Sequence, residues 1–261
     1  MGNILEIKKG AALIEIGADS HNVNYNGSVP NVGNVNDALE SLQSQINEFE
    51  PSDVINVAGK WVSVGTSITR QDADSNNGYQ TKVRQVLNFS DFYNGGTNGA
   101  KISSAVSQLV AGDFYTIEFG VNDWRDGTTV GTLDDNFKAD TGTGTFFGSY
   151  RRLIDAIYNL NQYAKIILCT PRKAYSNPAG LWPLHWWDEN HGTYLKDYAD
   201  AVIEIGKWMS LPVCDWFYES GMNQDNLALY SVDVAVHPNA AGHQQMANLL
   251  VQTFKKVLNC G

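Results

Sequence analysis

Four short segments contain residues that together could form a serine-hydrolase site. A serine hydroxyl becomes a nucleophile when a base lies within hydrogen-bond reach and a third group orients that base. Donors must also face the oxyanion that develops on the attacked carbonyl, and each is worth roughly 3 kcal/mol of the barrier. The four segments supply these parts in the order Gly65-Thr66-Ser67, Asn94–Gly99, Gly120–Asp123 and His237-Pro238-Asn239.

The nucleophile and the base are expected to be Ser67 and His237. Ser67 follows a short apolar run, at the expected start of a helix. Read alone, a serine there is more often a helix cap, so its interpretation depends on the other segments. His237 lies in a turn that opens the final helix, from which an imidazole can point back at the sheet edge. Asp233, four residues earlier, could accept its Nδ1–H.

Two further residues are expected to provide oxyanion donors. Gly99 has no side chain, so its backbone N–H can approach a substrate closely. Asn122 can present a side-chain amide to the same oxygen, and the backbone N–H of Ser67 completes the set. No Gly-x-Ser-x-Gly motif is present, which argues against the α/β-hydrolase arrangement of these groups.

Strands and helices alternate from about residue 60 onward. Apolar runs predict strands at 61–64, 89–93, 115–119, 165–169 and 212–216, and helical spacing predicts helices at 79–87, 102–110, 146–163, 194–209 and 240–258. This alternation indicates an α/β fold with a parallel sheet that is covered on both faces. Sites in such sheets form at the carboxyl ends of strands, where Ser67, Gly99 and Asn122 all fall.

Residues 1–56 form a separate N-terminal appendage in this interpretation, and residues 57–261 form the main domain. Alternating segments predict brief strands at 4–7 and 12–16, and an apolar stripe predicts a helix that starts near Asp37. The stripe is expected to pack on the main domain. The alternative, a short self-associating coil over residues 34–50 that makes a homo-oligomer, stays open.

Composition limits the classes of partner. The net charge of −10 argues against a nucleic-acid backbone or an anionic membrane as partner. The three cysteines lack metal-ligand spacing, and HExxH, P-loop and GxGxxG motifs are absent, so we expect neither metal nor cofactor. No signal peptide or transmembrane span is recognised, which predicts a soluble protein and leaves secretion open.

Aromatic residues gather in the loop 175–191. Trp182, Trp186 and Trp187 lie there beside two prolines, which suggests an irregular aromatic lid that could stack on sugar rings. Packing in the core or at its rim is the alternative. Asp123, next to Asn122, is a further candidate for substrate binding.

At these residues the chain resembles the SGNH (GDSL-type) hydrolase family. The resemblance runs from about Val62 to the C-terminus, and the four blocks occur in the order of the family. It implies a flavodoxin-like three-layer α/β/α sandwich with five parallel strands. It also implies a nucleophile at Ser67, a base at His237, and oxyanion donors at Ser67, Gly99 and Asn122.

The sequence departs from the family pattern at two positions. Thr66 replaces the usual Asp, which is not essential to the chemistry. The acid of the family normally lies three residues before the histidine, where this chain has Val234. Either a bulge brings Asp233 into place, or a backbone carbonyl holds His237 and the site is a Ser-His dyad.

The segment from Asn34 to Leu42 resembles a segment common in phage tail and fibre proteins. This resemblance implies an extracellular or virion-attached enzyme that removes acyl groups from a host surface polysaccharide.

The sequence thus predicts a metal-independent serine esterase with an acyl-enzyme on Ser67, acting on an O-acetylated carbohydrate. The alternative from another class is a non-catalytic carbohydrate-binding or phage structural protein, in which His237 lies too far from Ser67 for proton transfer. Lipase or thioesterase action is the alternative among enzymes and would need an apolar groove.

Overall fold

The computed structural model describes residues 54–75, 77–139, 144–174, 185–232 and 236–259, and the backbone of three strands between residues 5 and 26. The chain divides into two compact units, Met1–Asp53 and Val54–Gly261. The sheet of the second unit begins at Ile55, two residues before the expected boundary at residue 57.

The first unit contains an antiparallel sheet of three strands, β1 (Leu5–Lys9), β2 (Ala12–Ile16) and β3 (Val23–Asn26). The two strands expected from alternating residues are present. The third strand was not expected, because it lies in an Asn-rich stretch with little hydrophobic signal. The helix expected near Asp37 and the segment 34–42 lie outside the described residues.

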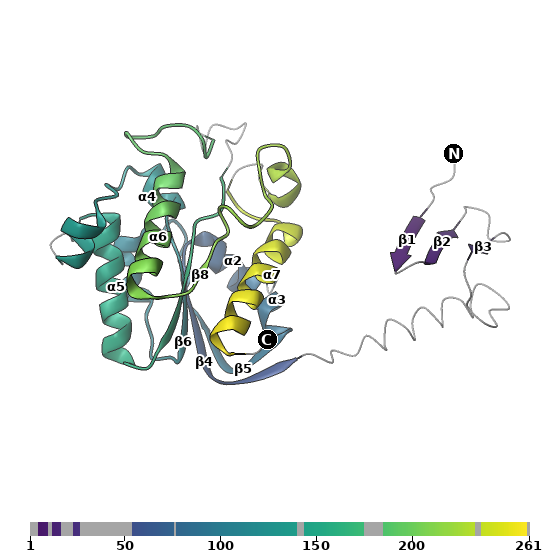
Figure 1. Ribbon diagram of the computed structural model, residues 1–261, viewed down its shortest axis with the longest axis horizontal. Coiled ribbons are helices and arrows are strands. Elements are labelled where there is room, and N and C mark those ends of the chain that lie inside the picture. The colour runs from purple at the N-terminus through teal and green to yellow at the C-terminus, as the bar shows by residue number, and fades with distance from the viewer. Residues whose placement is uncertain are drawn as a thin grey trace. The chain divides into compact units, whose positions relative to one another are not determined.

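The second unit is built on five parallel strands, as the alternation predicted (Figure 1). Their bounds are β4 (Ile55–Gly65), β5 (Leu87–Asn94), β6 (Phe114–Glu118), β7 (Lys165–Cys169) and β8 (Val213–Cys214). Their order in the sheet is β5-β4-β6-β7-β8. The order reverses between β4 and β6, and the crevice at the carboxyl ends of two such strands is where ligands bind in open α/β sheets.

Helices cover both faces of this sheet, which confirms the three-layer α/β/α sandwich. The α-helices are α2 (Ser67–Ser75), α3 (Tyr79–Arg84), α4 (Val121–Arg125), α5 (Phe146–Leu160), α6 (Leu195–Met209) and α7 (Ala240–Val257). Shorter helical turns are η1 (Ile102–Gln108), η2 (Leu133–Lys138) and η3 (Leu227–Tyr230). Figure 1 shows α5 and α6 on one side of the strands and α3 and α7 on the other.

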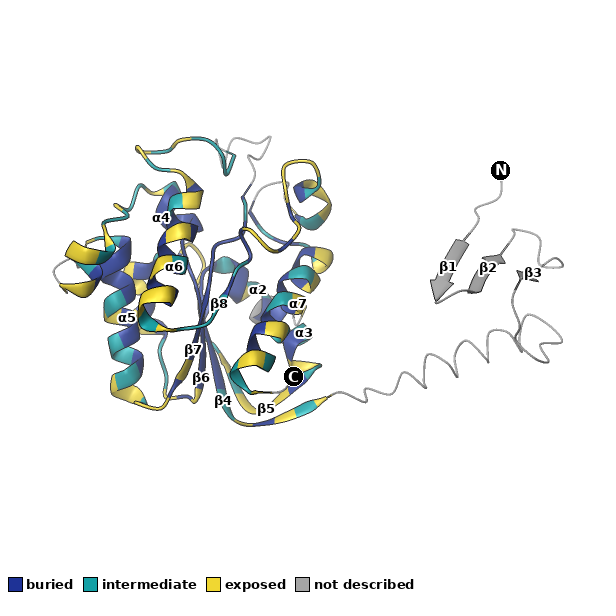
Figure 2. Ribbon diagram, viewed as in Figure 1, coloured by how far each residue is buried: buried dark blue, intermediate teal, exposed yellow. Residues whose placement is uncertain are grey.

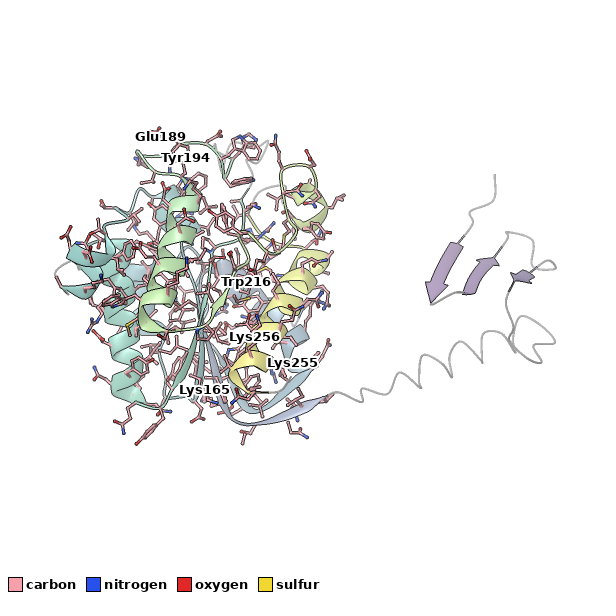
Figure 3. The ribbon with its side chains drawn as sticks, viewed as in Figure 1. Lys165, Glu189, Tyr194, Trp216, Lys255 and Lys256 are labelled. Carbon is pink, nitrogen blue, oxygen red and sulfur yellow. The ribbon has the colours of Figure 1, made fainter. Side chains whose placement is uncertain are left out.

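Each long helix buries one stripe of apolar residues against the sheet, as its sequence period predicts (Figure 2). Leu153, Ile154 and Ile157 of α5 are fully buried. Trp216, between β8 and α7, donates its indole N–H to the carbonyl of Met246 over 3.0 Å (Figure 3). Long-range packing of this kind fixes the distance between the sheet and its helices.

Two elements differ from the expected ones. β4 begins six residues before the expected strand, because Ile55–Lys60 pairs with β5 alone and contains a bulge between Val57 and Lys60. Gly59, at φ +123°, occupies that bulge and interrupts the apolar pattern. The helix expected at 102–110 is a 3₁₀ helix that ends at Gln108.

Candidate active site

Ser67 is the first residue of α2 and follows β4 by one residue. The turn needs glycine at position 65, since a Cβ there would lie 2.2 Å from Thr69 Oγ1 and 2.8 Å from Glu118 Oε2. The side chain of Gln108 holds the same residue: its Oε1 accepts from Gly65 N over 2.9 Å and its Nε2 donates to Gly65 O over 3.1 Å. The serine is therefore fixed at the carboxyl edge of the sheet.

Glu118, the last residue of β6, holds the turn between β4 and α2 through hydrogen bonds. Its Oε2 accepts from Thr66 N (3.0 Å), Thr66 Oγ1 (2.7 Å) and Thr69 Oγ1 (3.1 Å). Burial raises the pKa of Glu118 to about 7. The hydrogen bonds from Thr66 and Thr69 act in the opposite direction and lower this pKa, with the larger effect from Thr66. Thr66, which stands where the family has Asp, thus ties the serine turn to the neighbouring strand.

His237 lies in the turn that opens α7. Asn239 caps this helix, because its Oδ1 accepts from Gly242 N over 3.0 Å. The backbone around the histidine is held as well: Val232 N donates to His237 O over 2.9 Å, and Asn239 N donates to Tyr230 O over 3.0 Å. The His-Pro-Asn motif therefore caps the helix and also fixes the position of the imidazole.

Arg172 holds the same segment from the end of β7. Its side chain is buried, and it donates to the carbonyl of Val236 and to Ser231 Oγ, each over 2.8 Å. One guanidinium therefore clamps both ends of the segment that leads to His237. The sequence analysis did not identify Arg172, because a charged residue three positions after a buried strand has no distinctive pattern.

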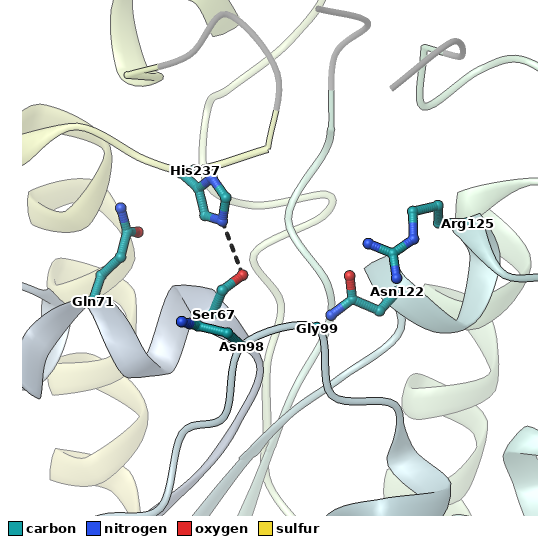
Figure 4. A pocket seen from close by; sticks show the side chains of 7 residues that line it. All are labelled: Ser67, Gln71, Asn98, Gly99, Asn122, Arg125 and His237. Atoms are coloured by element: carbon teal, nitrogen blue, oxygen red, sulfur yellow. Dashed lines mark hydrogen bonds between the residues drawn. The ribbon is translucent and has the colours of Figure 1, made fainter. Parts of the chain in front are cut away.

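The fold brings Ser67 and His237 together from positions 170 residues apart. The Oγ of Ser67 lies 2.9 Å from Nε2 of His237 (Figure 4). When the serine donates in this hydrogen bond, the proton of the neutral imidazole lies on Nδ1. Asp233, expected to accept that proton, and Val234 lie outside the described residues.

The two further oxyanion candidates lie at the same pocket. Gly99 has φ +70°, and a Cβ on it would meet no atom within 4 Å, so it borders open space. Asn122 is buried, and its Nδ2 donates one hydrogen to the carbonyl of Ala100 over 2.9 Å. That bond orients the amide, whose Nδ2 carries a second hydrogen.

The pocket has a volume of about 350 Å³, within the size class of small-molecule sites. Seven of the described residues line it: Ser67, Gln71, Asn98, Gly99, Asn122, Arg125 and His237. Among these residues every side chain is polar, and Gly99 contributes backbone atoms alone. Figure 4 shows Gln71 and Arg125 at opposite ends, with Ser67 and Asn122 between them.

Asp123 does not contact this pocket, contrary to the expected role in substrate binding. Its side chain is fully buried, and its carboxylate oxygens each lie 3.3 Å from the N–H of Ile102, which donates to them. Burial raises its pKa to about 7, against the lowering effect of the Ile102 hydrogen bond and of the charge on Lys101. It therefore holds the loop that carries Gly99.

The tryptophans of the expected lid are not found among the described residues that line the pocket. Trp186 packs edge-on against Phe217 with ring centroids 5.5 Å apart, and Trp187 stacks on His185 at 4.5 Å. Lys173 lies over the Trp186 ring at 5.1 Å. Trp182 lies outside the described residues. Trp186 therefore packs against neighbouring side chains, as the alternative of packing in the core or at its rim predicts.

Gln71, Asn98 and Arg125 line the pocket but were not among the expected site residues. Gln71 lies one helical turn after Ser67, and Arg125 lies three residues after Asn122, so spacing along α2 and α4 was the available signal. Gln71 is oriented from behind, because His243 Nε2 lies 3.2 Å from its Oε1. Burial lowers the pKa of His243 to about 3, so its imidazole is neutral. Its Nδ1 accepts from Tyr79 N over 3.1 Å, so the proton lies on Nε2 and is donated to Gln71.

The described residues hold no cluster of three or more His, Cys, Asp or Glu side chains with metal-site geometry. None of their helices has both the length and the apolar character that a bilayer crossing needs.

Comparison with known proteins gives the following matches. The model of the GDSL-like lipase/acylhydrolase family matches residues 63–245. A protein from Chitinophaga pinensis described as a possible lipase superposes with a TM-score of 0.66 at 24% identity, over 78% of this chain and 100% of its own. A Lactobacillus plantarum protein gives 0.65 at 22% identity, over 77% and 98%. A member of the lipolytic G-D-S-L family from Veillonella parvula gives 0.52 at 16% identity, over 77% and 100%. No curated protein matches in sequence.

Proposed function

Because the chain belongs to the GDSL-like lipase/acylhydrolase family, we propose that it is a serine esterase that forms an acyl-enzyme on Ser67. The observation that carries the proposal is the 2.9 Å contact between Ser67 Oγ and His237 Nε2, which is within reach for proton transfer. The contact lies at the carboxyl edge of the sheet, in a pocket that also contains Gly99 and Asn122.

In the first half of the reaction, His237 Nε2 takes the proton of Ser67 Oγ as the oxygen attacks the ester carbonyl carbon. The carbonyl oxygen becomes an oxyanion, which accepts hydrogen bonds from the backbone N–H groups of Ser67 and Gly99 and from Nδ2 of Asn122. The imidazolium then gives its proton to the leaving alcohol oxygen, and the C–O bond breaks.

In the second half, a water molecule replaces the alcohol. His237 takes a proton from this water as its oxygen attacks the acyl carbon on Ser67, and the same donors bind the second oxyanion. The proton returns to Ser67 Oγ as the acyl–serine bond breaks. The products are a carboxylic acid and the regenerated serine, so atoms and charge balance over the cycle.

The proposed substrate is a short-chain ester, and an O-acetylated carbohydrate fits best. The pocket side chains are polar along the described lining, so they match hydroxyl groups rather than a long acyl chain. A lipase would gain affinity from apolar side chains at about 25 cal/mol per Å² of buried surface, and no apolar side chain is among the described residues that line this pocket.

The non-catalytic alternative rests on a different geometry. A binding or structural protein with this fold has no need for a histidine near the serine, and His237 out of reach of Ser67 was its expected sign. The 2.9 Å separation argues against it. Residues 34–50 belong to the first unit. A role for them in attachment to a virion is compatible with either function of the second unit.

The proposal is tested by hydrolysis of 4-nitrophenyl acetate by the wild type and by Ser67→Ala. We expect activity in the wild type and a loss of at least about 10³-fold in the variant, because no other group replaces the nucleophile. Release of acetate from an acetylated polysaccharide is measured in parallel. Equal activity of the two proteins would refute the role of Ser67, and inactivity of the wild type on both substrates would refute the esterase.

A further inference from the structure

Arg125 brings a permanent positive charge to one end of the active-site pocket. Its guanidinium lies on the far side of Asn122 from Ser67 in the view of Figure 4. Arginine stays protonated at every pH at which the protein is folded, and its planar group binds carboxylates through paired hydrogen bonds. No step of the ester hydrolysis described above uses this charge.

Among the described residues, one carboxylate lies between two cations at that end of the pocket. Arg125 Nε lies 2.6 Å from Asp126 Oδ1, and its Nη2 lies 3.1 Å from Oδ2. Lys101 Nζ lies 3.9 Å from the same Oδ2. Two cations therefore share one carboxylate.

Two further titratable groups act on this cluster. His191 lies close enough to help to lower the pKa of Asp126, after the larger effect of Arg125. Asp123 faces Lys101, but its pKa is raised to about 7, so a large fraction of it is protonated at neutral pH. The chain as a whole carries a charge of −10, so a positive pocket wall runs against its composition.

We propose that Arg125 forms an anion-binding subsite, and that the preferred substrate is an O-acetylated sugar acid whose carboxylate binds Arg125 while its acetyl ester lies at Ser67. This inference rests on the proposed esterase function and names its substrate class. An acetyl group is uncharged and fills only a small part of a pocket of about 350 Å³, so the alcohol portion of the substrate reaches Arg125.

The test compares kcat/KM for acetate release from O-acetylated polygalacturonate and from O-acetylated xylan, the first acidic and the second neutral. For Arg125→Gln, we expect the acidic-to-neutral ratio to fall roughly tenfold, mainly through KM, because a charge-assisted hydrogen bond at a partly exposed site is lost. Arg125→Lys should recover part of the ratio, since it keeps the charge without the planar fork.

Asp126→Asn separates anion binding from a purely structural role of Arg125. Asp126→Asn removes one negative charge from beside Arg125 and Lys101, so the acidic-to-neutral ratio should rise, by roughly threefold. If Arg125 served only to hold Asp126, both variants would break the same pair and shift the ratio in the same direction. Opposite shifts support the subsite, and parallel shifts overturn it.

Arg151→Gln is the matched control. Arg151 forms a comparable pair with Asp155 on α5, at 2.7 Å, and it is not among the described residues that line the pocket. The acidic-to-neutral ratio of kcat/KM and the activity of Arg151→Gln should equal those of the wild type. In the wild type, raising the ionic strength from about 0.01 M to 1 M should reduce the acidic preference, because the screening length shrinks from roughly 30 Å to 3 Å.

The outcomes distinguish this inference from the proposed function. If neither polymer and no simple acetate is hydrolysed, the esterase itself is refuted. If both polymers are hydrolysed with a ratio that Arg125→Gln leaves unchanged, only the subsite is refuted.

Discussion

Asn122 illustrates how one side chain acquires a defined direction in this site. One Nδ2 hydrogen is committed to the carbonyl of Ala100, so the amide plane is fixed before any substrate arrives. Such preorganisation is what gives an oxyanion donor its effect, because no reorganisation is needed as charge develops. The loop that carries Ala100 is in turn held by Asp123 through the N–H of Ile102.

Replacing Asn122 by Ala should lower kcat on 4-nitrophenyl acetate by about 10²- to 10³-fold with little change in KM, because the lost donor acts mainly on the transition state. The measurement is steady-state kinetics of both proteins, together with thermal unfolding to confirm that the variant is folded. A variant that keeps wild-type kcat would remove Asn122 from the oxyanion site.

At the scale of elements, the start of α2 depends on a carboxyl group that never reaches the pocket. Glu118 ends β6, and its Oε2 accepts three hydrogen bonds from Thr66 and Thr69. The charge of Glu118 helps to raise the pKa values of three buried groups, Tyr79, Tyr150 and Cys169. The charge of Asp123 in turn helps to raise the pKa of Glu118. The strand and the helix are therefore joined through a buried acid with a pKa of about 7.

This raised pKa predicts how stability depends on pH. An unfolded glutamate titrates near pH 4.3, so between about pH 4.5 and 7 the native state binds more protons than the unfolded state. The contribution of Glu118 to the free energy of unfolding therefore falls as pH rises through this window. Glu118→Gln cannot ionise, yet its amide oxygen can accept the bonds now made to Oε2.

We therefore expect the stability of Glu118→Gln relative to wild type to increase from pH 5 to pH 8, by roughly 3 kcal/mol at most. Denaturant unfolding at the two pH values measures this difference. Glu204→Gln, at an exposed position of α6, is the control and should show no comparable trend. A difference for Glu118→Gln that stays constant or shrinks with pH would contradict the buried acid.

For the whole molecule, the chain divides into two compact units, Met1–Asp53 and Val54–Gly261. The five-stranded sheet and the described pocket residues all belong to Val54–Gly261. The first strand of that sheet begins at Ile55, so a division after Asp53 removes no strand from it.

A protein of residues 54–261 should therefore fold and keep the 4-nitrophenyl acetate activity of the full chain within about twofold, since its core and site are intact. Thermal unfolding and kinetics of both proteins are the measurements. Size-exclusion chromatography of the same pair tests the proposed self-association through residues 34–50, which predicts a larger species for the full chain alone. An unfolded or inactive 54–261 protein would show that the first unit is needed.

The architecture of the second unit follows from local patterns in the sequence. Strand β7 has the expected bounds, and α7 ends one residue before its expected limit, because hydrophobic period and helix caps are local properties of a segment. The order of strands and helices then requires a parallel sheet, and it puts Ser67 and Asn122 at the carboxyl ends of β4 and β6.

The distances between side chains and their burial depend on how distant segments pack. The 2.9 Å contact between Ser67 and His237 joins positions 170 residues apart, and Arg125 reaches the pocket while its neighbour Asp123 is buried away from it. The pKa of about 7 at Glu118 likewise arises from burial by other segments. Distance and burial depend on how separate elements pack, and no local pattern of residues specifies that packing.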